Sequence, residues 1–98
     1  MHHNKAFGVT IEASINALAP GQVAVTADGI LKRLAMSPGA TRTDMAGSAA
    51  RGRYVFSAIV DESEAEAAAV LAVDLFRKAA AGTSIHVRGV GVHEIETV

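Results

Sequence analysis

The stretch RGRYVFSAIVD, residues 51–61, decides how this chain folds, because it is apolar on both sides of an extended backbone. Successive side chains of a strand point to opposite faces of its sheet. Each face therefore receives apolar side chains, Tyr54, Phe56, Ala58 and Val60 on one and Val55 and Ile59 on the other. A strand with two apolar faces is typical of the inside of a sheet, so we predict a central strand here.

Two segments upstream are also predicted to be strands. FGVTIEASI, residues 7–15, alternates between apolar residues and small or polar ones, which indicates a strand with one buried face. TRTDMAGSA, residues 41–49, is a weaker candidate. The segment from Gly47 to Gly52 has the composition of a hairpin loop that would join this candidate to the central strand.

The segment DESEAEAAAVLAVDLFRKAAAG, residues 61–82, predicts a helix directly downstream. Ser63 and Glu66 have the spacing of a capping box, and Arg77 and Lys78 lie in the last turns, where the helix dipole favours cations. Gly82 suits the left-handed position that often follows a helix. The expected buried stripe consists of Leu71, Leu75 and Ala79, widened by Val70, Val73 and Phe76.

The segment APGQVAVTADGILKRLAMSPGA, residues 19–40, allows two interpretations. Five apolar residues fall at helical spacing, and Asp28 can pair with Lys32 one turn later. Against a helix, Asp28 and Gly29 form a dipeptide that can close a tight hairpin, and Gly29 costs a helix about 1 kcal/mol relative to alanine. We favour the helix, with the apolar stripe Val23, Ala27, Ile30, Leu31 and Leu34.

The chain ends in SIHVRGVGVHEIETV, residues 84–98, an apolar stretch whose alternation changes phase. The aliphatic residues change parity near Gly89 and again near His93 and Glu94. Glycine inside a strand often marks a bulge or bend. We therefore predict a long last strand, bent at Gly89 to Gly91, whose distal half leaves its own sheet and covers a second copy of the chain.

The resulting order is strand, helix, strand, strand, helix, strand, which is the split βαβ or ferredoxin-like arrangement of the α+β class. It predicts a single domain over residues 1–98, with residues 1–5 flexible. Two helices should cover one face of a four-stranded antiparallel sheet, with the first and third strands in the middle. The other face of the sheet should be open.

Composition narrows the classes of function. The formal net charge is −1 and no basic cluster is present, so we expect no nucleic-acid partner. No apolar run approaches the roughly 20 residues that span a bilayer, and the chain has no cysteine, so we expect a cytoplasmic protein without a membrane partner. Half of the residues are apolar but many are alanine, and a core this thin favours oligomerisation, most simply a homodimer.

Two sets of residues are candidate sites. The predicted open face would carry a polar binding set, made of Glu12, Ser14, Ser57, His86 and Arg88. A predicted oligomer interface consists of aliphatic residues, namely Val55, Ile59, Val90, Val92 and Ile95. If the first and last strands are neighbours, Glu12 would face His86 or Arg88. That pair could be a general base with its orienting partner, but we favour a cross-strand ion pair.

Other chemistry finds little support, and we expect no catalytic residue, cofactor or metal. His86 and His93 differ by seven positions, so a regular strand would place them on opposite faces and more than about 20 Å apart. His2 and His3 have the spacing of an N-terminal Cu(II) or Ni(II) site, which nothing else supports. Tyr54 has the opposite parity from the stacking aromatics of an RNA-recognition strand, which favours a place in the core.

Two functions remain. The first is a non-enzymatic interaction or regulatory module, a homodimer that uses its open sheet face and its C-terminal strand. The alternative is a cofactor-independent small-molecule-binding protein or enzyme, in which two such units pair their sheets into a dimeric α/β barrel. The alternative rests on analogy between folds.

Overall fold

The computed structural model describes residues 4–16 and 19–95. Six elements follow one another along the chain: β1 (Lys5–Ile15), α1 (Pro20–Ala35), β2 (Thr41–Ser48), β3 (Arg53–Glu62), α2 (Ala65–Ala79) and β4 (Ile85–Ile95). This order is the predicted one. The flexibility predicted for residues 1–5 concerns mainly residues outside the described ranges, and β1 already begins at Lys5.

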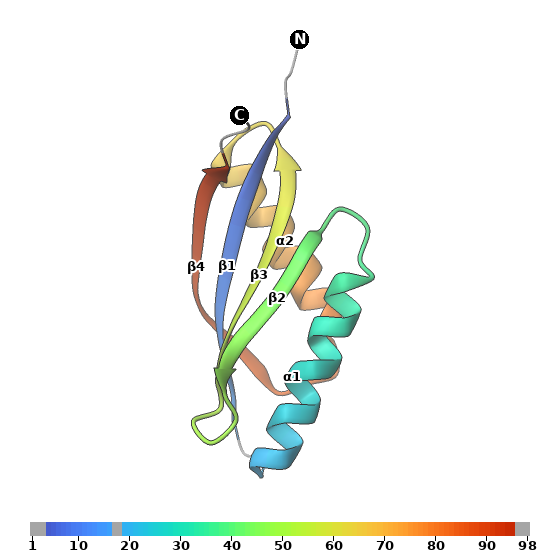
Figure 1. Cartoon of the computed structure of the whole chain (residues 1–98), viewed down its shortest axis with the longest axis vertical. Helices are drawn as coiled ribbons and strands as arrows, with labels where there is room; N and C mark the ends of the chain where they lie inside the picture. The colour runs from blue at the N-terminus through green and yellow to red at the C-terminus, as the bar shows by residue number, and fades with distance from the viewer. Residues whose placement is uncertain (1–3, 17–18, 96–98) are drawn as a thin grey trace.

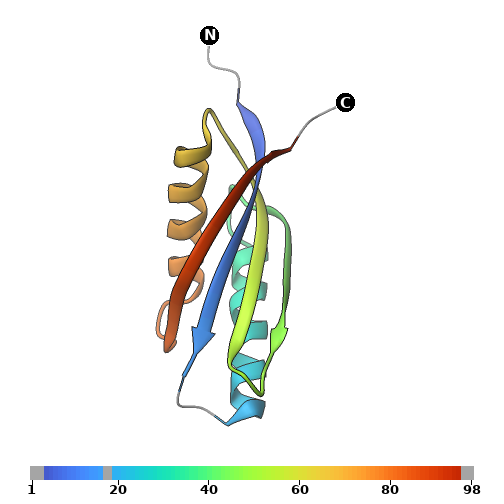
Figure 2. The ribbon, with the colours of Figure 1, turned by 90° about the vertical axis from the view of Figure 1, so that its left-hand side faces the viewer.

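The four strands form one antiparallel sheet in the order β2-β3-β1-β4, so that the first and third strands lie in the middle as predicted. Figures 1 and 2 show both helices on the same side of this sheet. The fold is therefore ferredoxin-like. None of the helices described is long and apolar enough to cross a membrane.

The core lies between the helices and the alternating face of the two central strands. Every second residue of β1 from Phe7 to Ile15, and of β3 from Tyr54 to Val60, is buried there. Phe56 packs against Phe76 of α2, with 5.0 Å between the ring centroids. Tyr54 and Phe56 thus belong to the core, as their parity predicted.

The helical interpretation of residues 19–40 is confirmed, and the hairpin alternative is wrong. Helix α1 runs from Pro20 to Ala35 and buries Val23, Ala27, Ile30 and Leu34, while Leu31 packs at the edge of the core. Asp28 pairs with Lys32 at 3.1 Å. Burying this stripe outweighs the helix penalty of Gly29, since one buried aliphatic side chain contributes about 1.5–3 kcal/mol.

Helix α2 differs from its prediction at its start and in its buried stripe. Strand β3 extends to Glu62, so the helix begins later and its N-cap is Glu64, without the predicted capping box at Ser63. The buried stripe consists of Ala68, Ala72, Leu75, Phe76 and Ala79. Val70 is 67% exposed instead of buried. Small alanine side chains face the sheet and let the helix approach it closely.

Strand β4 stays in its own sheet over its whole length, which corrects the prediction that its distal half leaves. It pairs with β1 from Ile85 opposite Ile15 to Ile95 opposite Ala6. One register shift, opposite Glu12 and Ala13, accounts for the first change of phase. The second predicted change is absent, because the ladder runs on regularly beyond it. One bulge is enough to keep the strand paired to its end.

Candidate functional site

The sheet face opposite the helices, called the open face here, carries all five residues of the predicted polar set. Ser14 pairs directly with His86, and Thr10 pairs with Ser57. Glu12 and Arg88 line one hollow in this face. Ser57 is separated from that hollow, because its partner Thr10 is two residues along β1 from Glu12.

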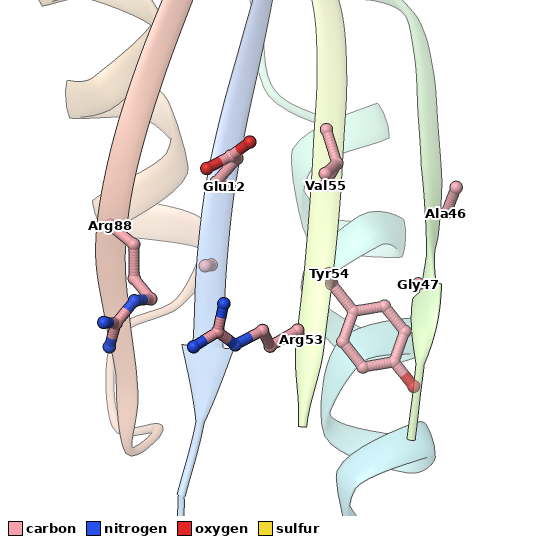
Figure 3. Close-up of a pocket in the computed structure, with 8 residues that line it drawn as sticks. Glu12, Ala46, Gly47, Arg53, Tyr54, Val55 and Arg88 are labelled. Atoms are coloured by element: carbon pink, nitrogen blue, oxygen red, sulfur yellow. The ribbon is translucent and has the colours of Figure 1, made fainter. Parts of the chain in front are cut away.

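The hollow lies at the end of the sheet where β1 stops and β3 begins, and has a volume of about 190 Å³. Its charged lining residues are Glu12, Arg53 and Arg88, and Val55 and Ala46 border it from β3 and β2. Figure 3 shows the Arg88 side chain directed toward this end of the sheet and the Arg53 side chain reaching sideways across β1.

Arg53 is the residue that sequence reasoning missed. The signal was present, because Arg53 has the same parity as Val55, which was assigned to the open face. Arg53 and Arg88 are distant in the sequence, so they form no basic cluster that the sequence alone could reveal. The sheet register places Arg53 opposite Ser14, within the predicted polar set.

Glu12 forms no ion pair with the arginines of the hollow. The ion pairs among the described residues are Lys5–Glu94, Lys32–Asp28 and Lys78–Asp74, all elsewhere on the molecule. In Figure 3 the Glu12 carboxylate points away from the two guanidinium groups. The favoured cross-strand ion pair of Glu12 with His86 or Arg88 is therefore wrong, and both arginines keep their donors free of any described carboxylate.

Ser14 is the one buried polar residue within the described part of the chain, at 5% exposure. Its hydroxyl oxygen has no hydrogen-bond partner among the residues described. The register places it between Arg53 on β3 and His86 on β4. A buried hydroxyl without a partner costs roughly 1–3 kcal/mol.

The two histidines of β4 lie on the same face, which corrects the prediction from a regular strand. The extra residue of the bulge shifts the alternation of β4 by one position. His86 therefore pairs with Ser14 and His93 pairs with Gly8, both on the open face. A side chain at Gly8 would collide with the His93 ring, which lies over the glycine. Six residues of β1 separate the two pairs, about 20 Å along a strand. No group of potential metal ligands occurs within the described residues.

The five aliphatic residues of the predicted interface divide between the two sides of the sheet. Val55 and Ile59 lie on the open face, and Ile95 lies there too, opposite Ala6. Val92 instead packs at the edge of the core. Val90, 42% exposed, borders an apolar hollow beside α2. The interface set is thus two separate surfaces.

The N-terminal Cu(II) or Ni(II) motif at His2 and His3 lies outside the described residues. Compared with models of known protein families and with curated proteins, the chain has no match. The geometry of the open face therefore supplies the argument for function.

Proposed function

We propose that this chain is a non-enzymatic interaction module that forms a homodimer, in which a second copy covers the open face. The observation that carries the proposal is the pair Val55 and Ile59 at the centre of a face that the chain's own helices leave uncovered. Val55 is 38% exposed. Apolar side chains gain about 25 cal/mol for each Å² removed from water.

A second copy is favoured because the face is self-complementary. Val55 and Ile59 lie two residues on either side of Ser57, and Arg53 and Asp61 lie four residues on either side. A two-fold axis above Ser57 and perpendicular to the strands would set Val55 beside Ile59 of the second copy. The same axis avoids placing Arg53 on Arg53, a like-charge contact that destabilises an interface.

The test is the mass of the protein in solution by light scattering. We expect twice the monomer mass for the natural sequence. Val55→Asp should give monomer, because the new carboxylate would be buried without a partner. Val25→Asp is the matched control, since Val25 lies on α1, is 74% exposed and should leave the mass unchanged.

A third variant separates the two surfaces of the predicted interface. Val70→Asp alters the apolar hollow between α2 and β4, far from the open face. If Val70→Asp abolishes the dimer and Val55→Asp does not, the dimer interface lies at that hollow and not on the open face. A natural protein that is a folded monomer at high concentration would refute the proposal entirely.

A second candidate is small-molecule binding between two paired sheets, as in a dimeric α/β barrel. The charged hollow favours it, because Arg53 and Arg88 have no described carboxylate partner and Ser14 has an unused hydroxyl. Ligand sites typically combine an apolar rim with a few convergent polar groups. Two strongly twisted sheets separate toward their ends, which would leave this terminal hollow accessible.

A further inference from the structure

We propose that Arg53, Arg88 and Ser14 form a binding site for an oxyanion, a carboxylate or phosphate group of a small molecule. This proposal deepens the second candidate function by naming its ligand class. All three residues belong to one copy of the chain, so the site itself does not require the dimer. Its failure and the failure of the dimer proposal are therefore distinguishable.

The two arginines provide the charge. They line the same hollow, in which Arg53 reaches across β1 toward β4, the strand that carries Arg88 (Figure 3). Guanidinium groups donate paired hydrogen bonds that match the geometry of carboxylate and phosphate oxygens. Two cations without a described counter-ion repel each other, and an oxyanion between them removes that repulsion.

The position of Arg88 in its strand is the second observation. Glu12 of β1 pairs with Gly89 and the next residue, Ala13, pairs with Val87, so Arg88 is the extra residue of the bulge. A bulge redirects side chains and occurs often beside functional sites. Here it adds a cation to the open face while the rest of β4 keeps its ladder.

Ser14 supplies the third observation, a buried donor that lies beside the hollow and next to Arg53, although it does not itself line the hollow. Its hydroxyl is covered and unpartnered, and its neighbours across the ladder are Arg53 and His86. The long side chain of Arg53 can move when an anion enters. The Ser14 hydroxyl then donates a hydrogen bond to an oxygen of the ligand and is no longer unsatisfied.

The size of the hollow and the position of Glu12 limit the rest of the ligand. A volume of about 190 Å³ is smaller than the roughly 300–1,000 Å³ of sites for drug-sized molecules. The Glu12 carboxylate lies at the far side of the hollow from the guanidinium groups. It repels a second negative charge and accepts a hydrogen bond, so the ligand is a small anion with a donor group at its other end.

The experiment is a titration of the full chain with inorganic phosphate, and separately with acetate, followed by amide chemical shifts at constant ionic strength and pH. We expect saturable shifts at residues around Ser14, Arg53 and Arg88. Arg53→Gln and Arg88→Gln should each weaken phosphate binding by about tenfold or more, since each removes charge-assisted hydrogen bonds. Ser14→Ala should weaken it several-fold, and Glu12→Gln should strengthen it.

Arg77→Gln is the matched control, because Arg77 is an exposed arginine of α2 outside the hollow and its loss should leave phosphate binding unchanged. Shifts that do not saturate, or an equal loss in Arg77→Gln, would overturn the proposal. The carboxylate of Asp61 in a second copy is the competing source of an oxyanion. If Arg53→Gln and Arg88→Gln abolish the dimer and phosphate does not bind, that carboxylate occupies the site and the proposal for a free ligand is wrong.

Discussion

Gly52 and Gly82 both have left-handed backbones but lie in different surroundings. Gly52 has φ +64°, and a Cβ atom there would lie 2.5 Å from the carbonyl oxygen of Ile15. The same contact closes the hairpin onto β1, because the Ile15 amide donates to the Gly52 carbonyl oxygen at 2.7 Å. Gly82 has φ +81° and open space around it. A substitution at Gly82 therefore tests backbone strain alone, whereas a substitution at Gly52 adds a steric clash.

We expect Gly82→Ala to lower the free energy of unfolding by about 1 kcal/mol, the cost of a left-handed conformation with a Cβ atom. Gly52→Ala should lower it by about 1–3 kcal/mol more, because the backbone must shift as well. Urea denaturation followed by circular dichroism measures both. Equal losses in the two variants would show that the hairpin absorbs the clash without cost.

Helix α1 shows how packing at the level of an element outweighs a local preference. Gly29 and the dipeptide it forms with Asp28 favoured a hairpin, yet the segment is helical because its stripe from Val23 to Leu34 is buried. The glycine itself fills no packing role. A Cβ atom at Gly29 would meet the Arg33 side chain at 3.4 Å, an ordinary contact.

Gly29→Ala should therefore stabilise the protein by up to about 1 kcal/mol, the difference in helix propensity. For a domain of this size that corresponds to a rise in Tm of roughly 4–8 °C. Thermal unfolding followed by circular dichroism checks it. Gly82→Ala is the control, since the same substitution outside a helix should lower Tm, and a fall in both variants would contradict the expected role of helix propensity.

Sequence patterns predicted these elements well where many residues repeat the same signal. The alternation of β1 predicted a strand with one buried face, the two-sided β3 predicted a central strand, and the order of elements predicted the topology. The errors arose where one residue decides the outcome. The single bulge at Arg88 changed the face of every later residue of β4, and one longer strand moved the N-cap of α2 from Ser63 to Glu64.

At the scale of the whole molecule, one core joins all six elements. Buried residues of both helices and of the central strands form a single hydrophobic cluster. The guanidinium of Arg33 in α1 also donates a hydrogen bond at 2.6 Å to the carbonyl oxygen of Ala79, at the end of α2. The candidate site also depends on the whole sheet. Arg53, Ser14 and Arg88 come from three different strands, and only the sheet register brings them together.

We expect the chain to unfold in one cooperative step, as a domain with a single core does. Tyr54 is the one tyrosine of a chain without tryptophan, and it lies in this core. Its fluorescence and the far-UV circular dichroism should therefore give the same midpoint in a urea titration. Different midpoints would show that part of the sheet or one helix unfolds separately.

The bulge in β4 has a consequence for the gene that encodes it. Loss of the single codon for Arg88 would leave Ile85, Val87, Val90 and Val92 in strict alternation with His86, Gly89 and Gly91, an ordinary strand with no irregularity. The ladder with β1 could then close without interruption. Arg88 is thus the residue of β4 that the ladder with β1 does not use, which fits a role outside the architecture.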